Sequence, residues 1–193
     1  RGRMMEYYLI CHGFVDEAKA LDPFMASLAQ RGVTQSASMA ESCRDWGIQF
    51  LCASTTIRSE QTADIIQKTL PAVVRWDLKE LEPVSIDDME GQVVFSSHVN
   101  RWTPAQFRYG MERTWVRLVA ALARIDIYAN SCALERVALV THADIINLCL
   151  YYWLGLDWTA YTRMDFAVEP GSSCRLSLAD GHVRLQWANQ RPH

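Results

Sequence analysis

The sequence has neither a long apolar run nor a strong excess of charge. A helix that crosses a membrane needs about 20 consecutive apolar residues. The longest candidate, residues 145–156, is shorter and is interrupted by Asn147 and Gly155. The formal net charge of −3 argues against nucleic acid or an acidic membrane surface as the main partner. We therefore expect a small-molecule partner, with no nucleic acid and no membrane.

The sequence also lacks a CxxC pair, although it contains six cysteines. This weakens any interpretation as a zinc site or a redox-active dithiol. Cys52, Cys149 and Cys174 fall inside apolar segments, where a free thiol packs as a small hydrophobic group. The start of the sequence shows no signal-peptide pattern. Reduced cysteines without such a pattern predict a cytoplasmic protein.

No internal repeat, low-complexity tract or linker divides the chain, so we expect a single domain over residues 1–193. Short apolar or alternating runs predict six strands, at residues 7–10, 49–53, 72–76, 137–140, 174–178 and 183–187. Helical patterns occur at residues 23–28, 34–46, 59–70, 104–125 and 144–154. Gly32 is expected to break the first two helices apart, and Asp180-Gly181 is expected to form the turn of a hairpin. This alternation predicts an α/β layered fold with a mainly parallel sheet and an antiparallel hairpin at one edge.

Three polar side chains follow predicted strands. His12 and His142 come directly after two of the apolar strands, and Arg58 follows the strand that ends at Ala53. Ligands of parallel α/β sheets collect at the carboxyl ends of the strands. We therefore expect these three side chains to meet in one site.

Five groups of motifs follow one another along the chain. They are Leu9-Ile10-Cys11-His12-Gly13; Leu28-Ala29-Gln30-Arg31-Gly32 with Gln35-Ser36-Ala37; Ser54-Thr55-Thr56-Ile57-Arg58 with Gln61-Thr62-Ala63; Leu78-Lys79-Glu80 with Met89-Glu90-Gly91; and Val140-Thr141-His142-Ala143. Over nearly the whole chain this ordered set resembles the histidine phosphatase (phosphoglycerate mutase-like) superfamily. The corresponding family motifs are Arg-His-Gly, Leu-Thr-x-x-Gly-x-x-Gln-Ala, Ser-Pro-x-x-Arg-Ala-x-Gln-Thr-Ala, Leu-x-Glu with Trp-Glu-Gly, and Val-Ser-His-Gly.

The resemblance implies a three-layer α/β/α sandwich with a mainly parallel six-stranded sheet. It also implies a phosphatase that hydrolyses a phosphate monoester and needs no cofactor and no metal. His12 is then the nucleophile that forms a phosphohistidine, and Arg58 clamps the phosphoryl oxygens. His142 donates a hydrogen bond to the transferring group, and the backbone at Ala143 begins a helix suited to an anion.

The resemblance assigns the general acid and base to Glu80, which protonates the leaving oxygen and then activates water. Glu82 is the alternative, because the segment up to Glu90-Gly91 is longer than is usual in the family. Gly13 and Phe14 complete the predicted phosphate-binding residues.

Cys11 is the main departure from the family pattern, because an arginine is expected there. Each hydrogen bond lost with a guanidinium contributes about 1.5–3 kcal/mol. If those bonds act in the transition state, the rate falls by roughly one to two powers of ten for each. Together with Phe14, Cys11 makes the mouth of the pocket less cationic and more apolar.

Residues 92–112 are expected to form a lid insertion over the site. Their aromatic side chains suit a small organic substrate, aromatic or apolar, better than a small sugar acid. The many tryptophans of the chain also suggest a homodimer surface, although such residues are usually part of the core.

Two other functions fit the same residues. One is a repurposed enzyme, in which His12, His142 and Glu80 perform acid–base chemistry on a substrate without phosphate. The other is a catalytically inactive protein that binds a phosphorylated ligand or a protein partner.

Overall fold

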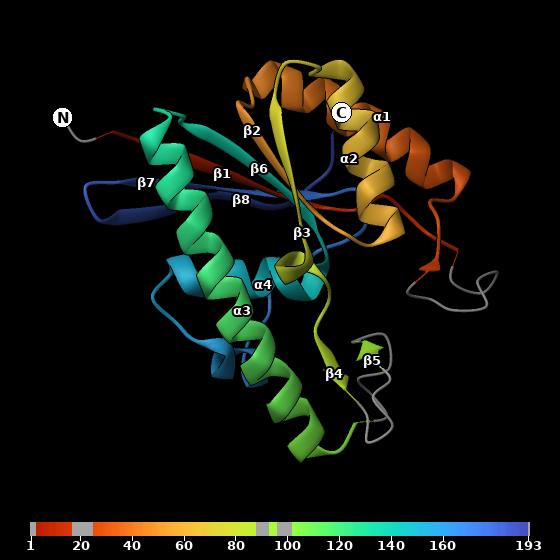
Figure 1. Cartoon of the computed structure of the whole chain (residues 1–193), viewed down its shortest axis with the longest axis vertical. Coiled ribbons are helices and arrows are strands. Elements are labelled where there is room, and N and C mark those ends of the chain that lie inside the picture. The colour runs from red at the N-terminus through yellow and green to blue at the C-terminus, as the bar shows by residue number, and fades with distance from the viewer. Residues whose placement is uncertain (1–2, 17–24, 88–92, 96–101, 193) are drawn as a thin grey trace.

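The computed structural model describes residues 3–16, 25–87, 93–95 and 102–192, and a six-stranded sheet lies at its centre (Figure 1). The strand order is β3-β2-β6-β1-β7-β8. The strands are β1 (Met5–Cys11), β2 (Phe50–Ser54), β3 (Val74–Leu78), β6 (Arg136–Thr141), β7 (Ser173–Ala179) and β8 (His182–Gln190). The first four in the sheet order run parallel to one another, β7 is antiparallel to β1, and β8 is antiparallel to β7. The predicted mainly parallel sheet with a hairpin at one edge is confirmed.

Helices cover both faces of this sheet. α1 (Gln30–Trp46) and α2 (Ile57–Thr69) pack on one face, and α3 (Pro104–Ser131) and α4 (Ala143–Trp153) pack on the other (Figure 1). The short 3-10 helices are η3 (Lys79–Leu81) and η5 (Trp158–Thr162), and β4 (Ser85–Asp87) pairs with β5 (Val93–Phe95) apart from the main sheet. Within the described part of the chain, no helix is both long and apolar enough to cross a membrane.

The strand β1 shows why the sequence forms this layered core. All of its residues are buried, and alternate side chains point to opposite faces. Tyr7, Leu9 and Cys11 join the core cluster beneath α3 and α4. Tyr8 and Ile10 join the second cluster, beneath α1 and α2. A strand covered on both faces reads as a continuous apolar run, which is the pattern that predicted it.

The expected break at Gly32 is wrong, because α1 begins at Gln30 and runs through this residue. Residues 25–28 form no α-helix, and Leu28 instead makes a β-bridge to Val15; residues 23 and 24 lie outside the described part. A Cβ atom on Gly32 would lie 2.1 Å from the carbonyl oxygen of Phe14, and one on Gly13 would lie 2.5 Å from the carbonyl oxygen of Gly32. These glycines therefore allow the loop after β1 to touch the first turn of α1.

Several other elements differ from the predicted boundaries, among them β3 and α3. β3 begins two residues later than expected, because residues 71–73 form a turn before the pairing with β2 starts at Val74. α3 continues six residues beyond residue 125. Its last turns are held by Tyr128, whose ring lies 4.6 Å from that of Trp76 and 4.8 Å from that of Phe50. These contacts depend on tertiary packing and not on the local pattern.

The predicted turn at Asp180-Gly181 is confirmed. It joins β7 to β8, and both residues have positive φ angles, 52° and 75°. This is the backbone twist that a two-residue hairpin favours.

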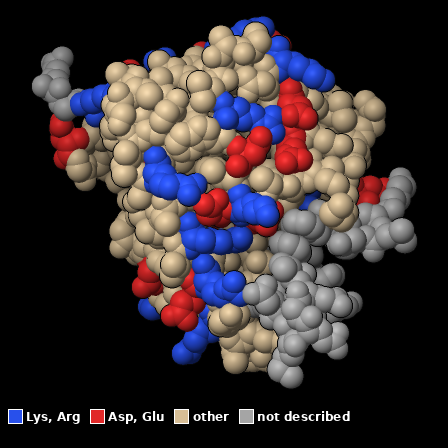
Figure 2. All heavy atoms as spheres, in the orientation of Figure 1, with Lys and Arg blue, Asp and Glu red and all other residues tan. Residues whose placement is uncertain are grey.

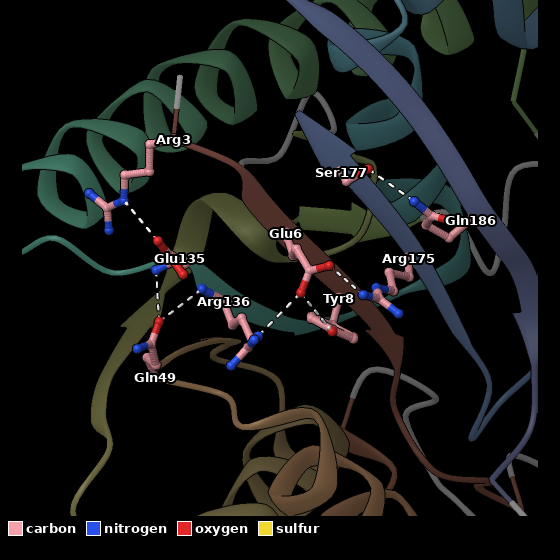
Figure 3. A network of polar contacts seen from close by, with 9 residues as sticks. All are labelled: Arg3, Glu6, Tyr8, Gln49, Glu135, Arg136, Arg175, Ser177 and Gln186. Carbon is pink, nitrogen blue, oxygen red and sulfur yellow. Dashed lines mark hydrogen bonds and ion pairs between the residues drawn. The ribbon is translucent and has the colours of Figure 1, made fainter. Parts of the chain in front are cut away.

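Figure 3 shows a polar network around the buried Glu6, near the start of β1. The side chain of Glu6 is only 6% exposed. It accepts hydrogen bonds from Tyr8 (3.2 Å), from Arg136 Nε (3.2 Å) and from Arg175. Burial raises the pKa of Glu6, but the two guanidinium groups and Tyr8 outweigh it and hold the pKa below its ordinary value.

Candidate active site

Three parallel strands end at the same edge of the sheet and carry the predicted polar residues with them. His12 directly follows β1, His142 directly follows β6, and Arg58 is the second residue of α2, just after β2. The structure brings these three buried side chains into contact. The imidazole ring centroids lie 5.0 Å apart, and the guanidinium reaches both rings.

The partners of His12 determine which nitrogen carries its proton. Nδ1 lies 2.8 Å from the carbonyl oxygen of Gly13, which can only accept a hydrogen bond. Nε2 lies 3.0 Å from Nε of Arg58, which can only donate. The proton is therefore on Nδ1, and Nε2 presents its lone pair.

Burial keeps this imidazole neutral. His12 is 8% exposed, and burial together with the charge of Arg58 lowers its pKa to about 3, against a smaller opposing effect of the Gly13 carbonyl. At neutral pH the ring is an uncharged base with one lone pair directed at Arg58. This is the form in which an imidazole acts as a nucleophile.

His142 faces Arg58 with Nδ1, 3.4 Å from Nη2, and faces three hydroxyl groups with Nε2. The hydroxyls belong to Ser54, Thr56 and Ser59, at 3.1, 3.3 and 3.4 Å. The pKa of His142 lies well below its ordinary value, first because of burial and then because of His12, Arg58 and Arg117. The second imidazole is therefore also neutral.

Cys11 stands beside this pair of histidines but belongs to the apolar core. It is 2% exposed and packs in the cluster beneath α3 and α4. Burial, and then the charge of Asp144, raise its pKa to about 12, while Arg58 and the N–H of Ala143 oppose the increase. The thiol is protonated at neutral pH, so it provides neither a thiolate nor a cation.

The two candidate carboxylates lie in different places. Glu80 forms an ion pair of 3.1 Å with Arg124 on α3, so the structure does not bring it to the histidines. Glu82 accepts a hydrogen bond of 2.5 Å from the hydroxyl of Thr55. Thr55 lies between Ser54 and Thr56, which both contact His142. Glu82 is therefore bonded to the residue between two contacts of His142, whereas Glu80 is bonded to α3.

The backbone of residues 81–84 is held by three side chains from other elements. Thr141 donates to the carbonyl of Leu81 (2.7 Å), and Arg117 Nη2 donates to the carbonyls of Glu82 and Pro83 (2.6 and 2.7 Å). Asp144 Oδ2 accepts from the N–H of Val84 (2.8 Å). Its other oxygen accepts from Ile145 (2.9 Å). The carboxylate of Asp144 therefore anchors this segment to the first turn of α4.

Sequence reasoning missed Thr55 and Arg117. Thr55 lies inside a run of small polar residues between a strand and a helix, and this position could have indicated that it belongs to the site. Arg117 had none, because it is one of several arginines along α3 and its role depends on where residues 81–84 fold.

The remaining predicted phosphate-binding residues are placed as follows. The N–H of Gly13 donates to Thr62 Oγ1 (3.0 Å), and the N–H of Phe14 donates to Gln35 Oε1 (2.8 Å). These bonds hold the loop after β1 against α2 and α1. Ala143 is the first residue of α4, and the hydrogen bond from its backbone N–H lowers the pKa of the Cys11 thiol against the effect of burial.

The predicted lid, residues 92–112, falls partly on residues outside the described part, namely 92 and 96–101. Its described portion contains β5 and the first turns of α3. Trp102 and Phe107 pack against the core cluster beneath α3 and α4, whereas Tyr109 is 49% exposed. Two of the aromatic residues that suggested an apolar substrate therefore contribute to the core.

Charges of both signs are interspersed on the face of the molecule seen in Figure 2. Among the residues that the structure describes, no group of three or more His, Cys, Asp or Glu side chains is arranged to hold a metal ion.

Comparison with known proteins agrees with this arrangement. Residues 7–191 match the model of the histidine phosphatase superfamily (branch 1), and the chain belongs to this family. No curated protein matches the chain by sequence.

Solved structures show the same fold at low sequence identity. The α-ribazole phosphatase from Shigella flexneri is 18% identical with a TM-score of 0.76, over 97% of each chain. The phosphoglycerate mutase from Bacillus anthracis is 15% identical with a TM-score of 0.73, over 98% of this chain and 94% of that one. A mycobacterial glucosyl-3-phosphoglycerate phosphatase is 16% identical with a TM-score of 0.73, over 96% of this chain and all (100%) of that one.

Proposed function

We propose that the chain hydrolyses phosphate monoesters through a phosphohistidine at Nε2 of His12. The observation that carries this proposal is the fixed tautomer of His12, whose Nδ1–H is held by Gly13 while the lone pair of Nε2 faces Arg58. The lone pair attacks phosphorus, and the bond from phosphorus to the ester oxygen breaks. Water then attacks the phosphohistidine, and the phosphorus–nitrogen bond breaks to release phosphate.

The neighbouring residues supply the other parts of this reaction. Arg58 moves from the imidazoles to the phosphoryl oxygens, where a planar guanidinium matches their geometry. His142 donates a hydrogen bond to the same group. Glu82, in place of Glu80, protonates the leaving oxygen and afterwards accepts a proton from the attacking water.

The similar structures include phosphatases of α-ribazole and of glucosyl-3-phosphoglycerate, and a phosphoglycerate mutase. Because one fold carries these different activities, the fold does not select the substrate of this chain. Sugar phosphates, nucleoside-like phosphates and aryl phosphates therefore all belong in a substrate screen, which covers the aromatic or apolar substrates suggested by the sequence.

The primary experiment measures phosphate release from such a panel by the native chain, His12→Ala and His182→Ala. His182 is an exposed histidine at the start of β8, so its substitution is a matched control. We expect release by the native chain and the control, no release by His12→Ala, and a ³¹P signal of an acid-labile phosphohistidine in the native chain. Release that persists in His12→Ala would exclude His12 as the nucleophile.

A second experiment tests the choice of carboxylate. General acid–base catalysis contributes about 10²–10⁴-fold. We therefore expect Glu82→Gln to lower kcat by roughly that factor and Glu80→Gln to change it by less than about twofold. The opposite order would return the role to Glu80.

One observation favours a competing function. Cys11 is a buried, neutral thiol, and it stands at the position where the resemblance leads us to expect an arginine. A protein that binds a phosphorylated ligand without turning it over fits the absence of this arginine. Tight phosphate binding without release of phosphate from any ester, together with turnover in Cys11→Arg, would support that function. If neither protein binds phosphate, acid–base chemistry on a substrate without phosphate becomes the better hypothesis.

A further inference from the structure

The hydroxyl cluster of Ser54, Thr56 and Ser59 surrounds Nε2 of His142. All three residues are at most 1% exposed, and their oxygen atoms lie 3.1–3.4 Å from this nitrogen. On the other side of the ring, Nδ1 lies 3.4 Å from Nη2 of Arg58. The two nitrogens therefore have partners of different kinds.

These partners determine the tautomer of His142 in this arrangement. A guanidinium can only donate hydrogen bonds, so Nδ1 accepts and the single proton of the neutral ring lies on Nε2. Nε2–H then donates to the hydroxyl cluster, whose nearest oxygen is that of Ser54. In this state Nδ1 of His142 carries no hydrogen, so the side of the ring that faces Arg58 offers no N–H donor.

A phosphoryl group bound beside Nδ1 of His142 requires the proton on the other ring nitrogen, Nδ1. Its oxygen atoms accept hydrogen bonds, so His142 can bind one through Nδ1 only if Nδ1 carries a proton. A doubly protonated ring is disfavoured because burial, His12, Arg58 and Arg117 all lower the pKa of His142. The remaining solution is a neutral ring with the proton on Nδ1, which requires a donor for Nε2.

Thr56 and Ser59 can provide that donor. Thr56 Oγ1 donates to Ser59 Oγ at 3.0 Å, which leaves the hydrogen of Ser59 free to point at Nε2. Thr56 is the N-cap residue of α2, but its side chain makes no capping hydrogen bond. The helix therefore does not require this hydroxyl.

We propose that the hydroxyl cluster is a set of positioning residues that lets neutral His142 transfer its proton from Nε2 to Nδ1 when a phosphoryl group binds. Ser54 accepts from Nε2–H in the empty site, and Thr56 with Ser59 donates to Nε2 in the occupied site. The proton on Nε2 leaves to solvent water and Nδ1 takes one proton from solvent water, so the ring stays neutral and no net charge is gained while the hydroxyls rotate. The proposal deepens the proposed function and rests on it.

The first test records ¹⁵N NMR spectra of the histidine rings in the native chain, empty and with orthovanadate or inorganic phosphate, using His142→Gln for assignment. We expect the proton on Nε2 in the empty protein and on Nδ1 in the complex. An unchanged tautomer, a doubly protonated ring in the complex, or no binding of either anion would overturn the proposal.

The second test compares anion affinity in two variants that remove different members of the cluster. Thr56→Val/Ser59→Ala removes the donors, so orthovanadate affinity should fall by roughly fivefold to tenfold, as expected for one hydrogen bond. Ser54→Ala removes the acceptor used by the empty site, so affinity should not fall. Thr56→Ser keeps the hydroxyl and should retain native affinity. Equal losses in the first two variants, or the opposite order, would contradict the proposal.

These measurements do not depend on turnover. If phosphate release proves independent of His12 while the tautomer still changes with orthovanadate, the proposed function fails and the inference about His142 stands. If release depends on His12 but the tautomer does not change, the inference alone fails.

Discussion

At the scale of single residues, the chemistry of His12 depends on its two neighbours. Gly13 fixes the proton on Nδ1, and Arg58 lowers the basicity of the ring that burial has already reduced. The same side chain on the surface would titrate near its ordinary pKa of about 6.5. Here it is neutral over the whole physiological range.

This difference gives a direct prediction for a pH titration. Because the pKa of His12 is lowered to about 3, its ring should stay neutral as the pH falls from 8 to about 4.5. We expect its ring resonances to remain constant over that range in NMR spectra of the native chain, assigned with His12→Ala. A titration step near pH 6.5 would show that the ring is accessible to solvent in the resting protein.

At the scale of elements, the segment of residues 81–84 connects the sheet to the site. Its backbone is fixed by Arg117 from α3, by Thr141 at the end of β6 and by Asp144 in the first turn of α4. Glu82 is therefore positioned by three elements, although it lies in a loop.

We predict that Arg117→Met lowers kcat by about tenfold while KM changes little. The methionine keeps much of the apolar stem but loses the bonds to the carbonyls of Glu82 and Pro83, so the carboxylate loses its fixed position. The matched control is Arg124→Met, which removes the ion pair of Glu80 on the same helix. Steady-state kinetics on the best ester would check both, and equal effects of the two variants would contradict the role of Arg117.

At the scale of the whole molecule, Glu6 ties together β1, β6 and β7 at a distance from the histidines (Figure 3). Its pKa is lower in the folded chain than in the unfolded one. Its ionised form therefore stabilises the fold at neutral pH, and this contribution is lost as the pH falls through the unfolded value of about 4.5 and below.

We predict that Glu6→Gln lowers the free energy of unfolding by about 2 kcal/mol at pH 7, because two arginines lose a buried partner. The difference from the native chain should shrink as the pH falls below about 4.5, because the unfolded chain binds a proton at Glu6 before the folded chain does. Urea denaturation at several pH values measures this. Glu135→Gln is the control, since that side chain is 55% exposed and its pair with Arg3 spans 3.9 Å; a loss of the same size there would contradict the explanation.

The sequence predicted most of the fold because buried strands and amphipathic helices leave strong local patterns. It also predicted His12, Arg58 and His142 as one group, since each follows a strand and parallel strands end together. It could not distinguish Glu80 from Glu82. These residues lie two positions apart in an irregular segment, where the local pattern does not determine which way each side chain points. Gly32 was misinterpreted for a similar reason, since a close approach by Phe14 leaves no local pattern.

In the hydrolysis that we propose, the contacts of Arg58 with both imidazoles have a consequence for the release of phosphate. The guanidinium already bonds to both imidazoles, so an arriving anion exchanges partners with it instead of filling an unoccupied site. The hydrogen bonds that Arg58 gains from phosphate are offset by those it loses to the imidazoles. When phosphate leaves, the guanidinium bonds to the imidazoles again. Product inhibition by inorganic phosphate should accordingly be weak, and departure of phosphate should not be the slow step of a catalytic cycle.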